Sequence, residues 1–346
     1  MRLHAASVGY RAHAASRHGE EARVLGVFEH ACSLLGGDGW VRALLTRLRP
    51  GPMNLVVPSL GRAIARLRPG QQARFVDQNI ILAEAGLVVE LEGAVVWPGV
   101  ALPAGPLAGE RARHADVLQA LTLAQDVPAR QGWMAWLPEF LGCAPGQGAR
   151  SEAAGSSGPH ASPWPLAPWA VAAARGLRQS ICDRRIDQAC AYVRDMIGVG
   201  PGLTPAGDDF LAGLLVAFDY AGRAGPDRLD WLAPLTEEAA AWARGHTTLV
   251  GEQQLRLAAS GEADQALGQA AVAVLWDVQP VEAPLLELLH LGSSSGGDTL
   301  AGICFASEVL SLVVPARLGS DSACEVTGRE ADVGGLQAPQ PKGEQS

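Results

Sequence analysis

The spacing of the apolar residues changes once along this chain, at about residue 110, and this change limits the folds open to it. Before it, short β-branched segments recur about every ten residues, as in 23–28, 53–57 and 87–97. After it, apolar residues recur at helical spacing, as in 186–197. The expected fold class is therefore α+β, a small antiparallel β-rich N-terminal domain, or open barrel, followed by a mainly α-helical C-terminal domain.

Composition suggests where the domains end. We expect a β-rich domain over residues 20–100 and a helical domain over residues 110–315. Within the second, residues 144–168 are rich in Gly, Ser, Pro and Ala, which bury little apolar surface and predict a flexible insert. Residues 316–346 are expected to form a disordered tail.

Charge and apolar content restrict the partners. The chain has 27 Lys and Arg against 36 Asp and Glu, a net charge of −9. No nucleic acid is expected as a partner, because phosphate binding needs a dense cationic face. The longest apolar run, 210–218, is far shorter than the roughly 20 residues that cross a bilayer, so no membrane is expected. Six cysteines without a Cys-x-x-Cys pair, and no apolar signal segment, predict a cytoplasmic protein with reduced thiols.

Residues 198–213, Gly-Val-Gly-Pro-Gly-Leu-Thr-Pro-Ala-Gly-Asp-Asp-Phe-Leu-Ala-Gly, combine a glycine loop with the start of a helix. Thr204 is expected to cap this helix and Pro205 to take its first position. The N–H groups and the positive dipole end of such a helix form a site for a small anion. Asp208 and Asp209 lie in the first turn, where the simpler alternative is that they only stabilise the helix dipole.

Residues 291–302, Leu-Gly-Ser-Ser-Ser-Gly-Gly-Asp-Thr-Leu-Ala-Gly, end in the same way. A shift of 89 residues pairs Gly207 with Gly296 and Asp209 with Asp298. It also pairs the two Leu-Ala-Gly triplets that follow. The repeat predicts a second glycine loop before a second helix, although neither loop contains the Gly-x-x-x-x-Gly-Lys-Ser/Thr phosphate motif.

The repeat also predicts that the two helices cross. Asp209 and Gly213 are four residues apart, as are Asp298 and Gly302, so each pair lies on one helix face. A crossing at the two glycines would gather both loops and both aspartates at one end. There the carboxylates could form an acid–base pair or hold a divalent cation such as Mg²⁺. The alternative is that the glycines serve only packing and the aspartates only capping.

Residues 244–249 add a third polar segment. Thr247 and Thr248 offer two hydroxyls between two predicted helices, with His246 beside them. Taken alone, such a threonine is most often an N-cap and the histidine a surface residue. His290 precedes the second loop and is either an acid–base group or a packed residue.

Together these segments resemble the AllH-type family. Residues 200–213 look like its most characteristic motif, and residues 292–302 and the Thr247–Thr248 pair are similar to two further ones. The resemblance covers about residues 20–315 without the insert. It implies a subunit of oxamate carbamoyltransferase in allantoin (purine) degradation, acting with other carbamoyltransferase subunits. That reaction converts oxalurate and phosphate to oxamate and carbamoyl phosphate.

The site predicted from the loops and the resemblance binds a small anionic substrate. Its catalytic residues are Asp209 and Asp298, which are also the candidate Mg²⁺ ligands. Its substrate-binding residues are Gly200, Gly202, Thr204, Gly207, Asp208, Thr247, Thr248, Ser294, Ser295 and Gly296. The chain has Ala206 and Ser293 where the family commonly has Ser and His. Two other functions remain open: a non-catalytic anion-sensing or scaffolding subunit, and a stand-alone metal-dependent hydrolase.

Overall fold

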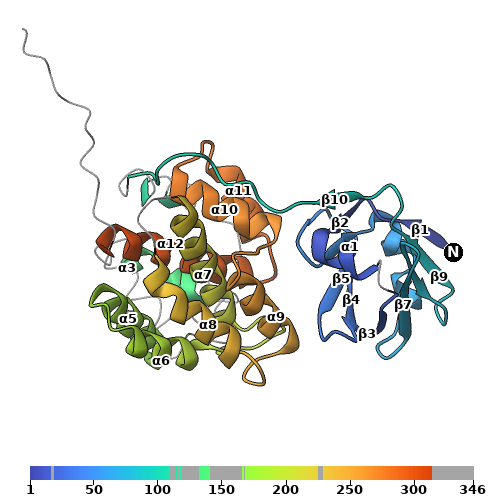
Figure 1. Cartoon of the computed structure of the whole chain (residues 1–346), viewed down its shortest axis with the longest axis horizontal. Coiled ribbons are helices and arrows are strands. Elements are labelled where there is room, and N and C mark those ends of the chain that lie inside the picture. Colours follow the sequence, from blue (N-terminus) through green and yellow to red (C-terminus); the bar gives the residue numbers. More distant parts are fainter. Residues whose placement is uncertain are drawn as a thin grey trace, which may run out of the picture. The chain divides into compact units, whose positions relative to one another are not determined.

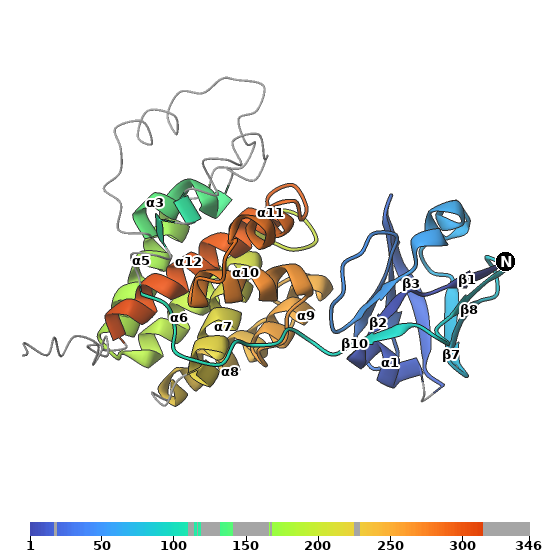
Figure 2. The same cartoon turned by 90° about the horizontal axis from the view of Figure 1, so that it is seen from above.

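The computed structural model describes residues 1–16, 19–109, 114–115, 117–118, 132–140, 166, 168–224 and 229–313. Apart from residues 166 and 168, the predicted insert lies outside this part of the chain, as does the predicted tail. Strands come first and helices follow, so the α+β class is confirmed (Figures 1 and 2). The sheet begins at Arg2, ahead of the predicted boundary at residue 20. The domain boundaries otherwise remain predictions.

Ten strands of the described residues form one sheet, in the order β1-β9-β8-β7-β3-β4-β5-β6-β2-β10. They are Arg2–His4 (β1), Ser7–Gly9 (β2), Glu21–Val27 (β3), Ala31–Gly36 (β4), Val41–Leu45 (β5), Asn54–Val56 (β6), Gln72–Val76 (β7), Asn79–Leu82 (β8), Leu87–Glu90 (β9) and Val95–Trp97 (β10). Most neighbours are antiparallel, but β1–β9, β5–β6 and β2–β10 are parallel. The sheet is therefore mixed rather than wholly antiparallel.

The sheet curls because its first two strands pair with different partners. Only residues 5 and 6 separate β1 from β2, yet β1 pairs with β9 and β2 with β6 and β10. Side chains alternate along strands such as β4, where every second residue is buried. The inward-facing side chains, among them Leu34, Leu55 and Phe75, form one apolar core.

The helical part has a core of its own. Its main helices are α5 (Pro168–Cys182), α6 (Ile186–Met196), α7 (Ala206–Ala224), α8 (Ala233–Trp242), α9 (Leu249–Ala258), α10 (Gln265–Trp276), α11 (Glu282–Leu289) and α12 (Ser295–Val313). A 3₁₀ turn η4 (Gly132–Trp136) and the short α3 (Leu137–Phe140) pack against α12. The helix predicted at 186–197 is confirmed as α6, which ends one residue earlier.

The α7 and α12 helices cross at the two glycines singled out in the sequence (Figures 1 and 2). A Cβ on Gly213 would lie 2.1 Å from the Thr299 carbonyl oxygen, and one on Gly302 would lie 1.9 Å from the Phe210 carbonyl oxygen. Only glycine permits such an approach of two helix backbones. The predicted crossing is confirmed, and it brings the first turns of the two helices together.

Gly207 and Gly296, the paired glycines of the repeat, occupy equivalent places. A Cβ on Gly207 would lie 1.9 Å from the carbonyl oxygen of Met196, at the end of α6. A Cβ on Gly296 would lie 1.9 Å from that of Leu288, near the end of α11. Both positions predicted to bind substrate are therefore used for close packing of a helix start against the preceding helix.

Among the described residues, α12 is the one helix long and apolar enough to cross a membrane by length and composition. Its most apolar window has a mean hydropathy of 1.3, but 83% of that window is buried inside the protein. Contact with α7, α10 and α11 thus accounts for its apolar surface.

Candidate functional site

Three carboxylates are buried where α7 and α12 begin. Asp208 and Asp209, in the first turn of α7, are 0% and 2% exposed, and Asp298, in the first turn of α12, is 0% exposed. We call these three residues the acid cluster. Burial of a charged carboxylate is costly without partners, so the hydrogen bonds at each oxygen decide its role.

Asp209 faces the second loop. Its Oδ1 atom accepts a hydrogen bond from Gln254 Nε2 on α9 at 2.9 Å. Next to it, the Thr204 and Ser295 hydroxyls hydrogen bond to each other at 3.0 Å and so join the two loops. Burial, with a smaller contribution from the charge of Asp298, raises the pKa of Asp209 to about 8, although interactions with the Gln254, Ser295 and Thr204 side chains act to lower it. The two aspartates are thus electrostatic neighbours.

Asp298 is held by a segment that the sequence analysis did not single out. The backbone N–H of Trp133 donates to Asp298 Oδ1 at 2.7 Å. A Cβ on the preceding residue, Gly132, would lie 2.3 Å from the same oxygen, and its φ of +68° also favours glycine. Burial raises the pKa of Asp298 to about 7, although hydrogen bonds from Trp133 and Ser294 lower it.

Two oxygens of the acid cluster are left over. Asp209 Oδ2 and Asp298 Oδ2 are buried and have no hydrogen-bond partner among the described residues. With pKa values of about 8 and about 7, the pair holds one to two protons at neutral pH. Such perturbed, partly protonated carboxyls are typical of sites that exchange protons with a substrate.

Asp208 has a different environment from its neighbour. The Gly198 N–H donates to its Oδ1 at 2.8 Å, and the Thr247 hydroxyl donates to its Oδ2. A Cβ on Gly251 would lie 2.2 Å from that Oδ2, so glycine makes room for the carboxylate. Burial raises the pKa of Asp208, against both hydrogen bonds. With both oxygens bound, this residue anchors the first loop; its predicted contact with substrate remains untested.

Thr248 also fastens the first loop. Its hydroxyl caps α9 by accepting the Gly251 N–H at 2.9 Å, and it donates to the Leu203 carbonyl oxygen. The capping alternative is therefore confirmed for Thr248. Thr204, predicted to cap α7, bonds across to Ser295, and the Pro205 carbonyl accepts the Asp209 N–H at 3.0 Å. The Thr204 and Thr248 hydroxyls thus connect segments of the site, and that of Thr248 also caps α9.

The loops above the acid cluster are open to solvent. Gly200 and Gly202 are exposed with φ of +109° and +104°, and Gly292 has φ of +63°. Ser294 is half-buried. The positive φ values at these glycines allow the chain to turn sharply before each helix begins.

The two histidines lie outside the acid cluster. His246 is exposed, stacks on Trp242 with ring centroids 4.1 Å apart, and bonds the Trp242 carbonyl through Nδ1. His290 is exposed and bonds the Leu286 carbonyl through Nδ1 at 2.6 Å. The surface alternative holds for His246, and His290 ends α11 rather than entering the site.

The metal prediction stays open. In the described part of the chain, no three His, Cys, Asp or Glu side chains are arranged to hold a metal ion. Asp209 and Asp298 would supply two carboxylates, and the Thr204 and Ser295 hydroxyls next to Asp209 would offer further oxygens. Mg²⁺ usually keeps several waters and takes few protein carboxylates, so this donor set is sparse but of the right kind.

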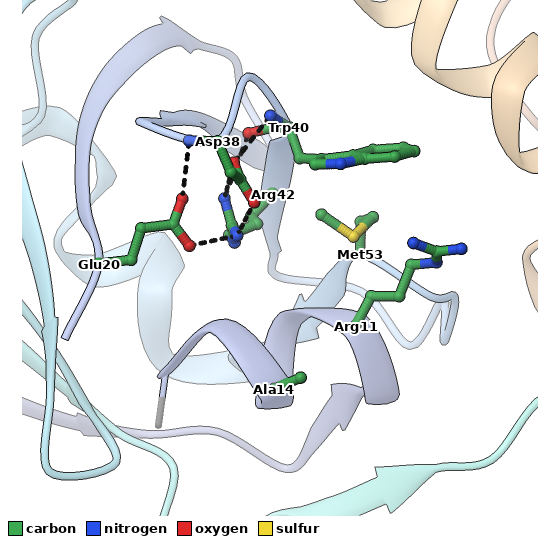
Figure 3. Close-up of a pocket in the computed structure, with 7 residues that line it drawn as sticks. All are labelled: Arg11, Ala14, Glu20, Asp38, Trp40, Arg42 and Met53. Atoms are coloured by element: carbon green, nitrogen blue, oxygen red, sulfur yellow. Dashed lines mark hydrogen bonds and ion pairs between the residues drawn. The ribbon is translucent and has the colours of Figure 1, made fainter. Parts of the chain in front are cut away.

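A cavity of about 310 Å³ in the sheet part is a second candidate (Figure 3). It is lined by Arg11, Ala14, Glu20, Asp38, Trp40, Arg42 and Met53. The buried Arg42 guanidinium pairs with Glu20 at 2.5 Å and with Asp38 at 2.7 Å, and Arg11 pairs with Glu262 at 2.5 Å. Both guanidinium groups are thus paired with carboxylates of the protein itself, and neither is left over to attract an anionic ligand.

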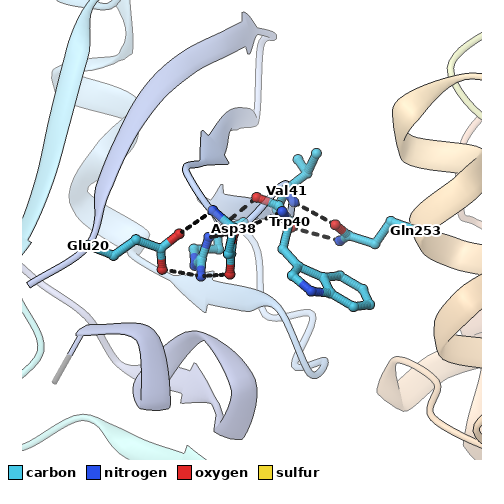
Figure 4. A network of polar contacts seen from close by, with 6 residues as sticks. Glu20, Asp38, Trp40, Val41 and Gln253 are labelled. Atoms are coloured by element: carbon cyan, nitrogen blue, oxygen red, sulfur yellow. Dashed lines mark hydrogen bonds and ion pairs between the residues drawn. The ribbon is translucent and has the colours of Figure 1, made fainter. Parts of the chain in front are cut away.

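Two adjacent side chains of α9 make hydrogen bonds to β5 and to the first turn of α7. The Gln253 amide accepts the Val41 N–H at 2.5 Å and donates to the Val41 carbonyl at 2.7 Å (Figure 4). Gln254, the next residue, donates to Asp209. The sequence did not predict Gln254, Gly132 and Trp133 as site residues, because a glutamine in a helix and a Gly-Trp pair belong to no recognisable site motif.

A comparison with protein-family models identifies the part of the chain that carries these features. Residues 196–307 match the model described as oxamate carbamoyltransferase subunit AllH. This is the family that the sequence motifs resemble, and the match is confined to this part of the chain. This AllH region runs from the last residue of α6 into α12, and so contains the whole acid cluster, Gln254 and both glycine loops. No curated protein and no solved structure matches the chain.

The raised pKa of Asp209 predicts how stability depends on pH. The folded protein keeps the Asp209 proton up to pH about 8, whereas the unfolded chain loses it near the ordinary value of 3.8. Between these values the folded state binds more protons, so the free energy of unfolding should fall as pH rises from about 4 to about 8. Asp209→Asn should flatten this fall and be more stable than wild type near pH 8. Urea unfolding at several pH values measures the free energy of unfolding of both proteins. If this free energy changed with pH equally in wild type and variant, Asp209 would not hold a buried proton.

Proposed function

We propose that this chain is a subunit of an oxamate carbamoyltransferase of allantoin degradation and that the acid cluster lies at its substrate site. The observation that carries the proposal is the meeting of Asp209 and Asp298, from two repeated glycine loops, at the crossing of α7 and α12. The AllH match over this region supports the reaction class.

The helix starts suit the anionic end of each substrate. Oxalurate, oxamate, phosphate and carbamoyl phosphate all carry a carboxylate or a phosphate. The first N–H groups of a helix have no partner within that helix, and its dipole is positive at this end. Here α7 and α12 begin side by side, beneath exposed loops with positive φ. The Gly207 and Gly296 N–H groups already donate to the Val199 and Leu291 carbonyl oxygens, so an anion would use other N–H groups of the two first turns. A small anion would be held there without any Lys or Arg.

The paired carboxyls suit the proton balance of the transfer. A phosphate oxygen attacks the carbamoyl carbon of oxalurate, the bond from that carbon to the oxamate nitrogen breaks, and carbamoyl phosphate forms. The phosphate loses one proton and the departing nitrogen gains one. A pair with pKa values of about 8 and about 7 can supply a carboxyl donor and a carboxylate acceptor together near neutral pH. Asp209, with the higher value, is the donor and Asp298 the acceptor.

The test is phosphate release from carbamoyl phosphate in the presence of oxamate, measured with the chain alone and together with its partner subunits. The proposal expects transfer only when this chain and its partners are combined. Transfer by the partners without this chain would support a scaffolding or sensing subunit. Mg²⁺-dependent hydrolysis by the isolated chain would support the stand-alone hydrolase. Either result would overturn the proposed role.

A further inference from the structure

The Gln254 side chain on α9 treats the two oxygens of Asp209 differently. Its Nε2 group donates a hydrogen bond to Asp209 Oδ1 at 2.9 Å. An amide nitrogen only donates, so Oδ1 must offer a lone pair, as the carbonyl oxygen of a protonated carboxyl does. The proton of the carboxyl then lies on Oδ2, the buried oxygen that has no hydrogen-bond partner among the described residues.

Asp298 shows the same arrangement with a backbone donor. The Trp133 N–H donates to its Oδ1 at 2.7 Å, and its Oδ2 is likewise buried without a partner in the described part of the chain. Each of the two buried acids therefore has one oxygen held by an N–H group and one oxygen left to carry a proton. Of the two donors, Gln254 is a side chain, so its effect can be tested by substitution.

The residue next to Gln254 fixes its position. The Gln253 amide accepts the Val41 N–H at 2.5 Å and donates to the Val41 carbonyl oxygen at 2.7 Å, so it pairs with β5 as a neighbouring strand would (Figure 4). Two hydrogen bonds of fixed direction restrict the turning and sliding of α9 at this point. Successive side chains leave a helix about 100° apart, so Gln253 reaches β5 while Gln254 reaches the first turn of α7.

Building on the proposed function, we propose that Gln254 is a positioning residue, which reserves Asp209 Oδ1 as an acceptor and thereby confines the transferable proton to Oδ2. This proton leaves as the bond between the carbamoyl carbon and the oxamate nitrogen breaks. The O–H bond at Oδ2 is broken, and an N–H bond forms on oxamate. Asp209 becomes a carboxylate, and the Gln254 N–H stabilises this charged form. Gln254 itself neither gains nor loses a proton, and it acts only through Asp209.

The charged groups around the Asp209 carboxyl stay in place when Gln254 is changed. Asp298 on α12 is the charged side chain that raises the pKa of this carboxyl. Asp208 on α7 has both its oxygens bound by other residues, and Glu252 and Arg256 on α9 pair with each other. Replacing the Gln254 amide with an uncharged side chain therefore removes one N–H donor and leaves these charges as they are.

The first test is the titration of Asp209 in the full chain, followed by carbon NMR with isotope-labelled aspartate carboxyls. The Asp209 signal is the one that is missing from Asp209→Asn. Gln254→Met removes the donor but keeps an unbranched side chain of similar size. The carboxylate then loses a stabilising hydrogen bond, so the titration midpoint should rise by about one pH unit. Gln254→Lys supplies a charged donor instead, and should lower the midpoint.

Gln253→Met is the matched control. It removes two amide hydrogen bonds to Val41, one residue away from Gln254 on the same helix, but it takes no donor from Asp209. This variant should lower the free energy of unfolding and leave the Asp209 midpoint at its wild-type value.

The second test is the pH dependence of carbamoyl phosphate formation from oxalurate and phosphate, catalysed by the chain together with its partner subunits. In this direction Asp209 must be protonated, so the rate should fall as pH rises through its pKa of about 8. In Gln254→Met this fall should move to higher pH by as much as the NMR midpoint does. The maximum rate should drop, because either oxygen can then carry the proton. Gln253→Met should keep the wild-type pH dependence, since a structural change alters the amount of folded protein rather than the pKa of Asp209.

Several results would overturn the role of Gln254. An unchanged Asp209 midpoint in Gln254→Met would do so, and so would a lower one, because the amide oxygen rather than the nitrogen would then face Asp209. An equal rise in Gln253→Met would assign the effect to the placement of α9. A midpoint that rises while the pH dependence of the rate stays unchanged would separate the Asp209 proton from the transfer.

The proposed function is judged separately, by the wild-type chain. Transfer in wild type with an unchanged pH dependence in Gln254→Met removes only the positioning role. Absence of transfer by the wild-type chain with its partner subunits removes the proposed function, and the NMR titration still decides whether Gln254 fixes the Asp209 proton.

Discussion

Asp209→Asn and Asp298→Asn are each expected to slow carbamoyl transfer by about 10²–10⁴-fold, the usual contribution of one positioned acid or base. Asparagine keeps the shape of the side chain and the hydrogen bond at Oδ1, but it can neither donate the carboxyl proton nor accept one. The two losses should be far from additive in the double variant, because both groups serve one proton balance.

The loss is measured as initial rates of phosphate release by the chain combined with its partner subunits. Glu308→Gln is the matched control. Its carboxylate is also buried on α12 but pairs with Arg178, and its replacement should lower stability without changing the rate per folded molecule. A rate within about threefold of wild type in either Asn variant would remove that aspartate from the proton transfer.

The second large effect concerns the crossing of α7 and α12. Gly213→Ala and Gly302→Ala should each destabilise the protein by about 3 kcal/mol, at the upper end of the usual cost of overpacking. The reason is the added Cβ, which would meet a carbonyl oxygen at 2.1 Å or 1.9 Å, so that one helix must move. Because the same crossing brings Asp209 and Asp298 together, transfer should fall as well.

Gly222→Ala, in the last turns of α7, provides the control. Of the atoms in the described part of the chain, its new Cβ would meet only the Leu229 Cβ, at an ordinary 3.7 Å. Alanine is the better helix former by about 1 kcal/mol, so this change should raise the free energy of unfolding. Chemical unfolding of all three variants distinguishes the cases. If Gly213→Ala or Gly302→Ala were as stable as Gly222→Ala, the helices could not cross where the structure places them.

Several features of the site follow from local sequence. The loop before α7 is rich in Gly and Pro and the loop before α12 in Gly and Ser, and Asp209 and Asp298 follow in the first turns of the two helices. The spacing of four residues from Asp209 to Gly213, and from Asp298 to Gly302, was enough to predict the crossing, because the helical period places both residues on one face. The approach distances at the two glycines confirm it.

Other features depend on residues that are distant in the chain. The N–H of Trp133 reaches Asp298 across 165 positions, and Gln254 reaches Asp209 across 45. Neither donor type is rare, and neither stands in a recognisable spacing. The parallel pairs β1–β9 and β2–β10 could not be predicted from the sequence either. Two short strands separated by two residues give no indication that they pair with different neighbouring strands.

The amino-acid sequence by itself determined the α+β class, the two loop-and-helix units and their meeting point, because these rest on periodicity and on the missing side chain of glycine. Only the tertiary structure decided which carboxylate oxygens of the acid cluster accept hydrogen bonds and which have no partner. Asp208 and Asp209 are adjacent in sequence, yet one anchors its own loop and the other keeps a buried oxygen without a partner. That difference arises from the hydrogen-bond donors that folding brings to each carboxylate, and the spacing of residues in the sequence does not predict those donors.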